Sequence, residues 1–482
     1  MNASITKDDS QRRTYQNKRI QHWTRLAKEL ESRRSLGRYY HHRTCEVLRF
    51  HIAPNQRILE VGCGPGDLLS ALAPVEGVGV DFCAEMLRQA RVRHPHLRFV
   101  DADAHDLKDL DGPFDAIIMS DLVNDLWDVQ TTFEAAARVS HPKTRLYINW
   151  YSKLWELPLQ AAAWLQFSKP MLEQNWLTGE DISDLLCLSG FEVMRRWNEI
   201  LWPIRTPGID TIVNRVLVKL WPFYRLALTN FIIARPIPVG VYAPPRVSVV
   251  VPARNEAGNI REIFERTPTM GRETELVFVE GHSTDDTYAA IQVEMTSHPD
   301  RKSRLFRQGG IGKADAVRLG FAHAEGDLLM ILDADVTVDP EQLVRFYEAA
   351  VSGKAELVNG VRFVYPMEKE AMRFANLIGN KFFSLTFTWL LGQPVKDTLC
   401  GTKVIWKEDY EKIVDNRAFF GDFDPFGDFD LLFGAARLGL KIIDIPVRYG
   451  ERKYGTTSIS RWRHGLLLLR MMCFAAKRIK FV

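Results

Sequence analysis

A run of five apolar residues followed by two carboxylates is the feature that most constrains how this chain can fold. Leu328–Leu332 has the length and composition of a buried strand, and turn residues bound it on both sides. Asp333 and Asp335 follow where this strand must end, with the small Ala334 between them. Ligands of open α/β sheets bind at the carboxyl ends of the strands. We therefore expect these carboxylates to hold a hard divalent cation, Mg²⁺ or Mn²⁺, against a diphosphate, although an isolated Asp-x-Asp also ends many ordinary strands.

The chain of 482 residues is too long for one ordinary domain, and proline-rich residues divide it near the middle. Pro236 and Pro238 precede the division and Pro244-Pro245 end it, which predicts a stiff linker. The predicted fold class is α/β with two Rossmann-like domains. The predicted parts are a basic helical extension at residues 1–50, a first domain at 51–238, the linker at 239–245, and a second domain with a basic tail at 246–482.

A glycine-rich turn follows the first predicted strand of the N-terminal half. Residues 57–61 have the pattern of a strand, residues 62–66 contain three glycines, and a helix is expected from Leu68. Glycines let the backbone approach a ligand closely, and the helix N-terminus offers free amides. The second predicted strand ends at Asp81, which is well placed to accept hydrogen bonds from a ribose. A nicotinamide-binding domain is the competing interpretation of these residues.

Taken together, these features resemble the class I S-adenosylmethionine-dependent methyltransferases. The resemblance is carried by Glu60-x-Gly-x-Gly-x-Gly66, Asp81 with Phe82 and Met86, Asp103-Ala104 and Ser120-Asp121. It implies that the glycines pass under the amino-acid part of the cofactor, that Asp81 binds the ribose, and that Asp103 and Ala104 meet the adenine. The residues implied to bind S-adenosylmethionine are Glu60, Gly62, Gly64, Gly66, Asp81, Phe82, Met86, Asp103, Ala104 and Ser120. The Asp103-Ala104 element argues against the nicotinamide alternative.

The loop after Ser120 faces this predicted cofactor site. Methyl transfer from a sulfonium is a direct displacement, so the protein mainly aligns the acceptor. Asp121, Asn124 and Asp125 either orient or deprotonate that acceptor, or they cap the following helix. Residues 195–228, which contain several Trp and Pro residues, are predicted to form a substrate cap.

The C-terminal half repeats the α/β pattern with different motifs. Its motifs are Pro252-Ala-Arg-Asn255-Glu256, Ser283-Thr284-Asp285, Gly312-Lys313, Asp333-Ala-Asp335 and Arg452-x-Tyr454-Gly455. In this order they resemble the family-2 glycosyltransferases of GT-A fold, and within them the polyprenol-phosphate sugar synthases most closely. The resemblance implies a metal held by Asp333 and Asp335. The residues implied to bind the nucleotide sugar are Pro252, Ala253, Asn255, Glu256, Glu280, Lys313, Asp333, Ala334 and Arg452.

Two positions depart from the pattern of that family. Glu280-Gly281-His282 stands where such enzymes have Asp-Asp-Gly, and a surface role is expected for the lone His282. Asp428 stands where many of them have the Asp of a Glu-Asp pair that supplies the general base, but the Glu is missing. A hydroxyl acceptor needs such a base and a phosphate acceptor does not. We predict Asp428 as the catalytic residue, with capping of the following helix as the alternative.

Basic residues gather at the two ends of the chain. Residues 1–50 hold twelve Lys and Arg against five Asp and Glu, and residues 448–482 hold nine against one. Such ends contact anionic lipid or a phosphorylated substrate, or they form a solvated surface. Nothing resembles a nucleic-acid module, so no nucleic-acid partner is predicted. The six scattered cysteines and the lack of an apolar N-terminal signal or a spanning segment predict a cytoplasmic protein, with peripheral contact at the inner face of an anionic membrane.

The sequence therefore predicts a bifunctional enzyme. It would join S-adenosylmethionine-dependent methyl transfer to inverting, metal-dependent glycosyl transfer from a nucleotide sugar to a glycan, a polyprenyl phosphate or a small-molecule acceptor. One alternative is a glycosyltransferase or a methyltransferase whose other domain binds without turnover. Another is a non-catalytic scaffold that uses its basic ends at a membrane.

Overall fold

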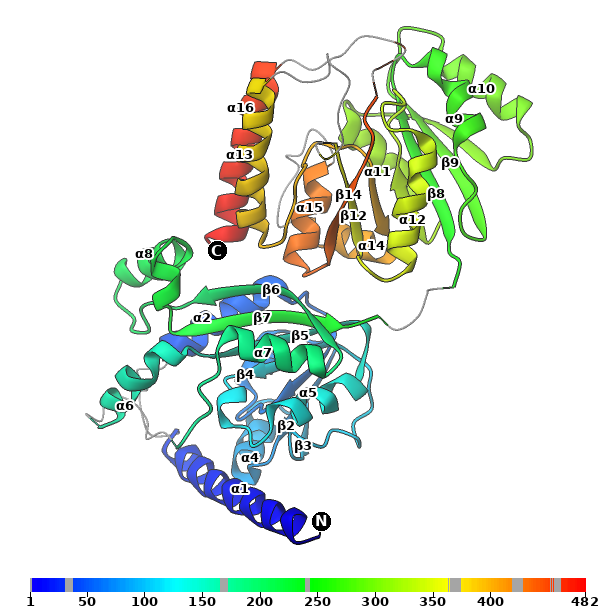
Figure 1. Cartoon of the computed structure of the whole chain (residues 1–482). Coiled ribbons are helices and arrows are strands. Elements are labelled where there is room, and N and C mark those ends of the chain that lie inside the picture. Colours follow the sequence, from blue (N-terminus) through cyan, green and yellow to red (C-terminus); the bar gives the residue numbers. More distant parts are fainter. Residues whose placement is uncertain are drawn as a thin grey trace. The chain divides into compact units, whose positions relative to one another are not determined.

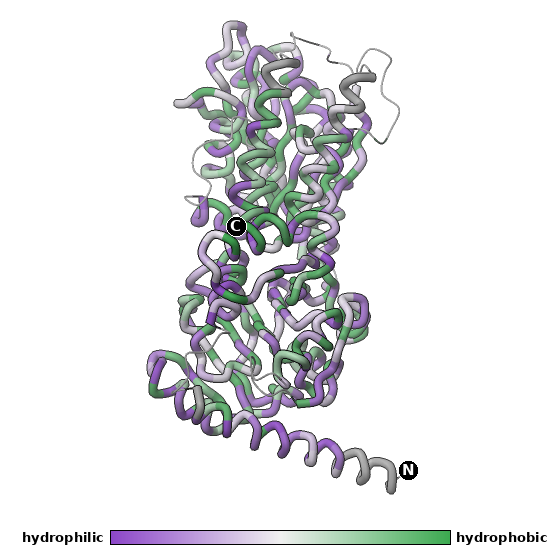
Figure 2. The backbone as a smooth tube through the Cα atoms, turned by 90° about the vertical axis from the view of Figure 1, so that its left-hand side faces the viewer, coloured by the Kyte–Doolittle hydropathy of each residue, from purple (hydrophilic) through white to green (hydrophobic). Residues whose placement is uncertain are grey.

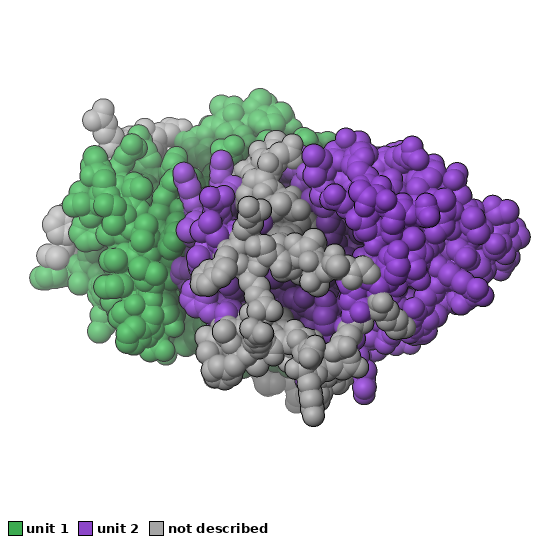
Figure 3. Space-filling view, turned by 90° about the horizontal axis from the view of Figure 1, so that it is seen from above, with its two compact units in different colours: residues 1–237, 481–482 green, residues 238–480 purple. Residues whose placement is uncertain are grey.

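The structure is a computed structural model of the whole chain. It describes residues 2–30, 38–164, 172–238, 243–362, 364, 374–417, 428–450, 452, 454 and 461–482. These form two compact units (Figures 1 and 3): unit 1 comprises residues 1–237 with 481–482, and unit 2 comprises residues 238–480. Residues 239–242 of the predicted linker lie outside the described residues.

Unit 1 is built on a seven-stranded mixed sheet with the strand order β3-β2-β1-β4-β5-β7-β6. Neighbouring strands from β3 to β5 are parallel, whereas β7 runs antiparallel to both β5 and β6. The carboxyl ends of β1, β2 and β4 therefore meet at one edge of the sheet. The strands are β1 (Arg57–Val61), β2 (Glu76–Asp81), β3 (Arg98–Asp101), β4 (Phe114–Ser120), β5 (Ser140–Tyr151), β6 (Phe191–Glu199) and β7 (Thr229–Pro236).

Helices cover both faces of this sheet (Figure 1), and apolar side chains fill a separate core under each layer. A capping box forms at the start of α7, because the side chains of Thr178 and Asp181 each bond to the backbone of the other residue. The helices are α1 (Asn2–Leu30), α2 (Arg38–His51), α3 (Asp67–Ala71), α4 (Ala84–Arg93), α5 (Val129–Arg138), α6 (Glu156–Trp164), α7 (Gly179–Leu188) and α8 (Ile209–Arg215). Short 3-10 helices are η1 (Val123–Asp125), η2 (Lys153–Trp155), η3 (Leu217–Lys219) and η4 (Phe223–Leu226).

Unit 2 contains a second seven-stranded mixed sheet, in the order β10-β9-β8-β11-β13-β12-β14. β11 pairs in parallel with β8 and antiparallel with β13, and its four residues are buried, as the apolar run predicts. The strands are β8 (Arg246–Ala253), β9 (Glu273–Glu280), β10 (Ser303–Arg307), β11 (Leu328–Ile331), β12 (Leu357–Val361), β13 (Lys403–Trp406) and β14 (Ile442–Pro446). Two α/β units, each with its own sheet, confirm the predicted fold class.

The helices of unit 2 fall into two groups. Most pack on the sheet, whereas α13 and α16 lie side by side next to it (Figure 1). None of the helices among the described residues is long and apolar enough to cross a membrane. The helices are α9 (Ile260–Arg266), α10 (Thr287–Ser297), α11 (Lys313–His323), α12 (Leu343–Val351), α13 (Phe374–Leu391), α14 (Lys407–Asp415), α15 (Asp428–Arg437) and α16 (Arg461–Ala475), with the 3-10 helices η5 (Ala257–Asn259) and η6 (Pro340–Gln342) and a π-helix η8 (Ala476–Lys480).

Candidate active sites

A tight turn after β1 brings three glycines to the carboxyl edge of the unit 1 sheet. Gly62 and Gly66 have φ angles of 75° and 76°, which L side chains rarely adopt. A Cβ atom at Gly66 would lie 2.7 Å from the Phe99 ring, and one at Gly62 would lie 2.8 Å from Leu122. At Gly64 nothing lies within 4 Å of such an atom. The turn therefore requires glycine where it packs and is open at its middle.

Two acidic residues brace this turn. The carboxylate of Asp81, at the end of β2, accepts hydrogen bonds from the N–H groups of Gly64 at 2.9 Å and Cys83 at 2.8 Å. Burial raises the pKa of Asp81, and these bonds oppose the shift. Glu60 on β1 is buried and accepts from the N–H of Leu69 at 3.1 Å, and burial raises its pKa to about 8. Both predicted residues thus hold the turn against the strand ends.

The carboxylate of Asp103 is surrounded by donors. It accepts from Arg12 Nη2 at 3.0 Å, from the Gln16 amide, and from the N–H of His105 at 3.1 Å. Burial alone would raise the pKa of Asp103, but the bonds from His105 and Arg12 outweigh it and lower the pKa well below its usual range. Ala104 beside it is buried. Helix α1 therefore contacts the predicted adenine end of the site.

The same helix covers the start of α4. Trp23 and Ala27 of α1 pack with Cys83 and Met86, and the partly buried Phe82 joins this cluster. Phe82 and Met86, which were predicted to line the cofactor site, are thus also contacts of the N-terminal helix. Sequence patterns gave no sign of this packing, because α1 and α4 are distant in the chain.

A hydrogen-bonded cluster lies beyond Ser120, the last residue of β4. Asp121 has a φ angle of 53°, and its Oδ1 accepts from the Tyr40 hydroxyl at 2.6 Å and from Asn149 Nδ2 at 2.7 Å. Burial raises the pKa of Asp121 to about 7, and the bond from Tyr40 opposes the shift. The structure thus adds Tyr40 of α2 and Asn149 of β5 to the residues around the predicted acceptor side.

The other two loop residues have different surroundings. Asn124 is fully buried, accepts from the N–H of Tyr151 at 3.1 Å and donates to the carbonyl of Asn175 at 2.7 Å. Asp125 lies 3.5 Å from Arg19 Nη2 of α1. Asn124 therefore braces the backbone, which leaves Asp121 as the loop residue best placed for an acceptor.

In unit 2, the first carboxylate of the Asp-Ala-Asp motif forms an ion pair. Asp333 Oδ1 lies 2.5 Å from Lys313 Nζ, at the start of α11, and Ala334 is buried behind it. A Cβ atom at Gly401 would lie 1.9 Å from Asp333 Oδ2 and 2.3 Å from Lys313 Nζ. The segment that carries Gly401 can approach this pair only because it has no side chain there.

The second carboxylate of the motif contacts a different cation. Arg452 Nη2 donates to Asp335 Oδ2 at 2.7 Å, and Arg452 Nη1 lies 3.3 Å from Glu256 Oε1. Asp335 Oδ1 accepts from Thr337 Oγ1 at 2.8 Å. Burial raises the pKa of Glu256 to about 7; Arg452 opposes this shift and Asp335 adds to it. Lys313 and Arg452 thus balance the two aspartates.

The segment after β8 is tied to the segment after β9. Pro252 and Ala253 end β8, and Asn255 follows with a φ angle of 57°. The N–H of Asn255 donates to Ser283 Oγ at 3.1 Å, and its Oδ1 accepts from the N–H of Thr284 at 2.7 Å. The side chain of Asn255 is therefore bound within the protein.

Glu280 has an equally local contact. It is buried at the end of β9, and its Oε1 accepts from the N–H of Ser283 at 2.5 Å. His282 is exposed, and its Nε2 lies 3.2 Å from the carbonyl oxygen of Gly310. The His282 ring therefore lies at the surface, against the backbone of Gly310.

Tyr454 extends the cluster formed by Arg452. Its hydroxyl donates to Asp285 Oδ2 at 3.4 Å, and its ring lies 2.6 Å from where a Cβ at Gly258 would stand. The late Arg-x-Tyr motif thus lies against both segments that follow β8 and β9.

The donor set predicted for a metal ion consists of two carboxylates. In the part of the chain that the structure describes, no three His, Cys, Asp or Glu side chains gather as metal ligands. Asp333 and Asp335 supply hard oxygen atoms, and a diphosphate would supply more. This chemistry fits a divalent cation that binds together with a nucleoside diphosphate.

The predicted catalytic Asp428 is the first residue of α15, but its side chain lies outside the described residues. Asp430, one position beyond Phe429, is buried and lies 2.9 Å from Arg417 and 3.4 Å from Arg318. In the sequence, Asp430 is marked only by its position as the second Asp of Gly427-Asp-Phe-Asp430.

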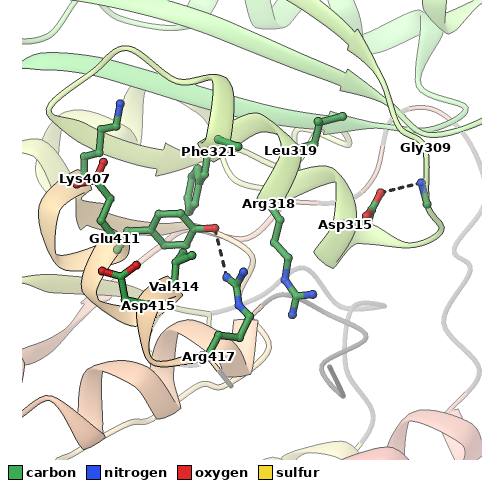
Figure 4. Close-up of a pocket in the computed structure, with 13 residues that line it drawn as sticks. Gly309, Asp315, Arg318, Leu319, Phe321, Lys407, Glu411, Val414, Asp415 and Arg417 are labelled. Carbon is green, nitrogen blue, oxygen red and sulfur yellow. Dashed lines mark hydrogen bonds between the residues drawn. The ribbon is translucent and has the colours of Figure 1, made fainter. Parts of the chain in front are cut away.

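A cavity of about 660 Å³ lies beside these arginines, between α11 and α14 (Figure 4). The Gly309-Gly310 loop, Tyr410 and Arg417 line it, and Arg417 Nη2 donates to the Tyr410 hydroxyl at 3.4 Å. Its lining carries both signs of charge, with Lys407 and the two arginines against Asp315, Glu411 and Asp415. The lining therefore gives the cavity no net preference for an anion.

Comparison with known families matches both halves of the chain. Residues 58–143 match the family model described as a methyltransferase domain, and residues 248–414 match that of glycosyl transferase family 2. Both resemblances predicted from the sequence are confirmed for these segments.

Curated relatives match the glycosyl transferase half. The dolichol-phosphate mannosyltransferase of Pyrococcus furiosus is 27% identical over 220 residues, covering 44% of this chain and 59% of that protein. The undecaprenyl-phosphate 4-deoxy-4-formamido-L-arabinose transferase of Klebsiella pneumoniae is 32% identical over 226 residues, 46% of this chain and 65% of that protein. The chain thus spans less than two thirds of the length of either relative.

Solved structures match each half at low identity. An S-adenosylmethionine-dependent methyltransferase from Mesorhizobium loti is 17% identical, with a TM-score of 0.31, over 40% of this chain and 96% of that one. Glucosyl-3-phosphoglycerate synthase from Mycobacterium tuberculosis is 20% identical, with a TM-score of 0.36, over 49% of this chain and 80% of that one.

Proposed function

We propose that this chain, which carries a methyltransferase domain and a family-2 glycosyl transferase domain, is a bifunctional enzyme. Unit 2 transfers a sugar from a nucleotide sugar with inversion, and unit 1 transfers a methyl group from S-adenosylmethionine. The observation that carries the proposal is the charge arrangement at the end of β11, where Lys313 pairs with Asp333 and Arg452 pairs with Asp335.

This arrangement suits the arrival of a diphosphate together with a cation. In each ion pair, the carboxylate can exchange its Lys or Arg partner for the divalent cation, while the Lys or Arg pairs with phosphate oxygens instead. No charge is then left unbalanced. When bound, Mg²⁺ or Mn²⁺ at Asp333 and Asp335 would neutralise charge on the departing nucleoside diphosphate. Lys313 and Arg452 then act on the same leaving group from the protein side.

The base and ribose of the nucleotide belong at the ends of β8 and β9 in this proposal. Pro252, Ala253 and Glu256 line one side, and Glu280 lines the other. Because Asn255 and Glu280 already bond to the turn at Ser283, they act mainly by holding the shape of the nucleotide pocket. Glu256 is held by Arg452, which links the nucleotide end to the diphosphate end.

For the acceptor we propose a polyprenyl phosphate. The curated relatives are named for dolichol phosphate and undecaprenyl phosphate, and a lipid needs an apolar surface. Helices α13 and α16 expose such residues: Phe382, Leu385, Trp389, Leu466 and Leu469. A phosphate oxygen is already ionised, so it attacks the anomeric carbon without a base while the bond to the diphosphate breaks.

In unit 1, the Gly62–Gly66 turn and Asp81 would hold S-adenosylmethionine, with its adenine toward Asp103. Asp121 would then meet the methyl acceptor, because it directly follows β4, the strand that pairs with β1 and so lies next to the glycine turn. A carboxyl with a pKa of about 7 is suited to take up a proton at neutral pH. Tyr40 and Asn149 fix its orientation.

The test is release of nucleoside diphosphate from a panel of nucleotide sugars, with Mg²⁺ or Mn²⁺ and with a chelator. We expect one donor to be hydrolysed slowly, and both the chelator and Asp335→Ala to stop the reaction. Asp339→Ala removes an exposed acid that pairs with Arg266 and should leave it unchanged. Calorimetric binding of S-adenosylmethionine should be retained in both variants. Donor hydrolysis that survives Asp335→Ala would refute the site.

A further inference from the structure

One surface of unit 1 is unusually apolar. Trp164, Leu157 and Trp221 are 83%, 74% and 73% exposed. We call this surface the apolar patch and define it by the exposed side chains of η2, α6 and the segment 202–226: Leu154, Leu157, Trp164, Trp202, Ile204, Ile209, Ile212, Val216, Leu220, Trp221, Phe223 and Leu226. Soluble monomers rarely expose so many large apolar side chains together, and patches of this kind mark interaction sites.

The two parts of the apolar patch are joined at their base. Trp155 Nε1 donates to the carbonyl of Leu226 at 2.8 Å, which ties η2 to η4. Trp155 and Leu159 pack against the buried Ile200 and Leu228. In Figure 1, α6 and α8 lie on the same side of unit 1, and Figure 2 looks onto that side, where green hydrophobic stretches are visible.

Helix α8 buries polar side chains and exposes apolar ones, the reverse of an ordinary surface helix. Asp210 and Asn214 of α8 are buried, whereas Ile209, Ile212 and the following Val216 face outward. Surface helices normally bury their apolar side, so this orientation indicates that the outer side does not face water in the working protein. The arrangement is also well anchored, because Asn214 Oδ1 accepts from the N–H of Trp202 at 2.8 Å and Asn214 Nδ2 donates to the carbonyl of the same residue at 2.7 Å.

The charged residues around the apolar patch indicate which kind of partner covers it. Arg205, Arg215 and Arg225 are exposed within residues 201–228, and Arg215 lies 3.6 Å from Glu46 of α2. Asp210 is the one acid in this segment, and it is buried. Within residues 201–228, tryptophan, other large apolar side chains and arginine occur without an exposed acid, a combination that favours the boundary between lipid head groups and acyl chains.

We propose that the apolar patch inserts into the interfacial layer of an anionic lipid bilayer and holds unit 1 at a membrane surface. The arginines contact lipid phosphates while Trp202, Trp221 and their aliphatic neighbours enter the acyl boundary. This attachment differs from the predicted one through the basic ends of the chain; at the N-terminal end, Arg12 and Arg19 pair with Asp103 and Asp125. It does not depend on either proposed activity.

The experiment is cosedimentation of the full chain with vesicles of phosphatidylcholine alone or with phosphatidylglycerol. The double variant Ile212→Glu/Trp221→Glu should lower partitioning onto anionic vesicles by about tenfold or more, because two apolar side chains are lost and two repelled charges are added. The matched control is Val75→Glu/Val92→Glu, which changes two side chains of unit 1 that are 69% and 73% exposed outside the patch. The control variant should lose far less of its partitioning onto anionic vesicles.

Further measurements separate the contribution of the arginines from that of the apolar side chains, and a membrane from a second copy of the chain. Arg205→Gln/Arg225→Gln should weaken binding to anionic vesicles several-fold and leave binding to neutral vesicles unchanged. Circular dichroism and S-adenosylmethionine binding should be unaltered in every variant. Equal losses in the patch variant and its control would overturn the proposal. So would a concentration-dependent dimer in lipid-free solution that Ile212→Glu/Trp221→Glu abolishes, because the patch would then bind a second copy.

Discussion

Arg452 Nη2 lies 2.7 Å from Asp335 Oδ2, although 117 positions separate the two residues. The same guanidinium reaches Glu256, so one side chain joins the end of β11 to the segment after β8. If this bridge serves the donor diphosphate, Arg452→Gln should reduce kcat/KM for the nucleotide sugar by roughly tenfold to a hundredfold, which corresponds to the loss of a charge-assisted hydrogen bond.

The control for this variant is Arg261→Gln, which removes an exposed arginine paired with Glu265 on α9. Steady-state kinetics with varied donor concentration would measure both. If Arg452→Gln kept the full kcat/KM, Arg452 would have only a structural part in unit 2.

Gly401→Ala tests the proposed donor site, because the added methyl group would occupy space that Asp333 and Lys313 fill. A Cβ atom there would overlap Asp333 and Lys313, so Gly401→Ala must displace one of the two charged groups. We expect glycosyl transfer to fall at least about a hundredfold while unit 1 keeps its affinity for S-adenosylmethionine. Gly379→Ala in α13, where nothing lies within 4 Å of the new atom, is the matched control and should stay active. An active Gly401→Ala enzyme would mean that this ion pair is dispensable.

Local patterns predicted the parts of the fold that depend on neighbouring residues. The apolar runs predicted β1 and β11, because a covered strand needs a largely apolar sequence. β10, with the sequence Ser-Arg-Leu-Phe-Arg, and β14, with Ile-Ile-Asp-Ile-Pro, were not recognised, because neither carries a long apolar run and most of their residues are only partly buried.

The sites divide in the same way. Motifs named Asp333, Asp335 and Asp81, since each follows a predicted strand directly. They did not name Tyr40, which bonds to Asp121 across 81 positions, or the α1 contacts of Asp103. Such pairs follow from tertiary packing, and a single sequence has no local signal for them.

Asp81→Ala tests the proposed S-adenosylmethionine site of unit 1. The carboxylate braces Gly64 and is placed to accept from a ribose, so its removal should weaken S-adenosylmethionine binding by about 1.5–3 kcal/mol. Asp101→Ala, which removes an exposed acid at the end of the neighbouring β3, should change the affinity little. Isothermal titration calorimetry measures both. Equal affinities in the two variants would defeat the placement of the ribose at Asp81.

Asp428→Asn distinguishes the acceptor classes. An ionised phosphate acceptor needs no base, so the variant should keep most of its transfer to a polyprenyl phosphate. If the natural acceptor is a hydroxyl, the same change should reduce kcat by about 10²–10⁴-fold, the usual worth of a general base. The measurement is kcat for a short-chain polyprenyl phosphate, with donor hydrolysis as the control for an intact donor site. A large loss of kcat with the phosphate would contradict the proposed acceptor chemistry.

The buried Glu60 predicts a pH dependence for the stability of unit 1. Its pKa is about 8 in the folded chain and 4.5 as the ordinary value, so the folded state binds more protons between these two values. Stability should therefore be lost as the pH rises from about 5 to about 8. Glu60→Gln removes the titration and can still accept from Leu69, so it should gain about 2 kcal/mol or more on the wild type at pH 8.5 and little at pH 5.

Thermal unfolding of the full chain at both pH values measures this difference, with the transition of unit 1 identified by its shift with S-adenosylmethionine. Glu85→Gln is the control, because Glu85 is paired with Arg88 on the surface of α4 and its pKa is lowered by that bond. Glu85→Gln should therefore bring no gain in the stability of unit 1 at pH 8.5. If Glu60→Gln showed the same difference from the wild type at pH 5 and pH 8.5, the carboxyl of Glu60 would be ionised throughout, and the turn after β1 would have to hold a buried negative charge.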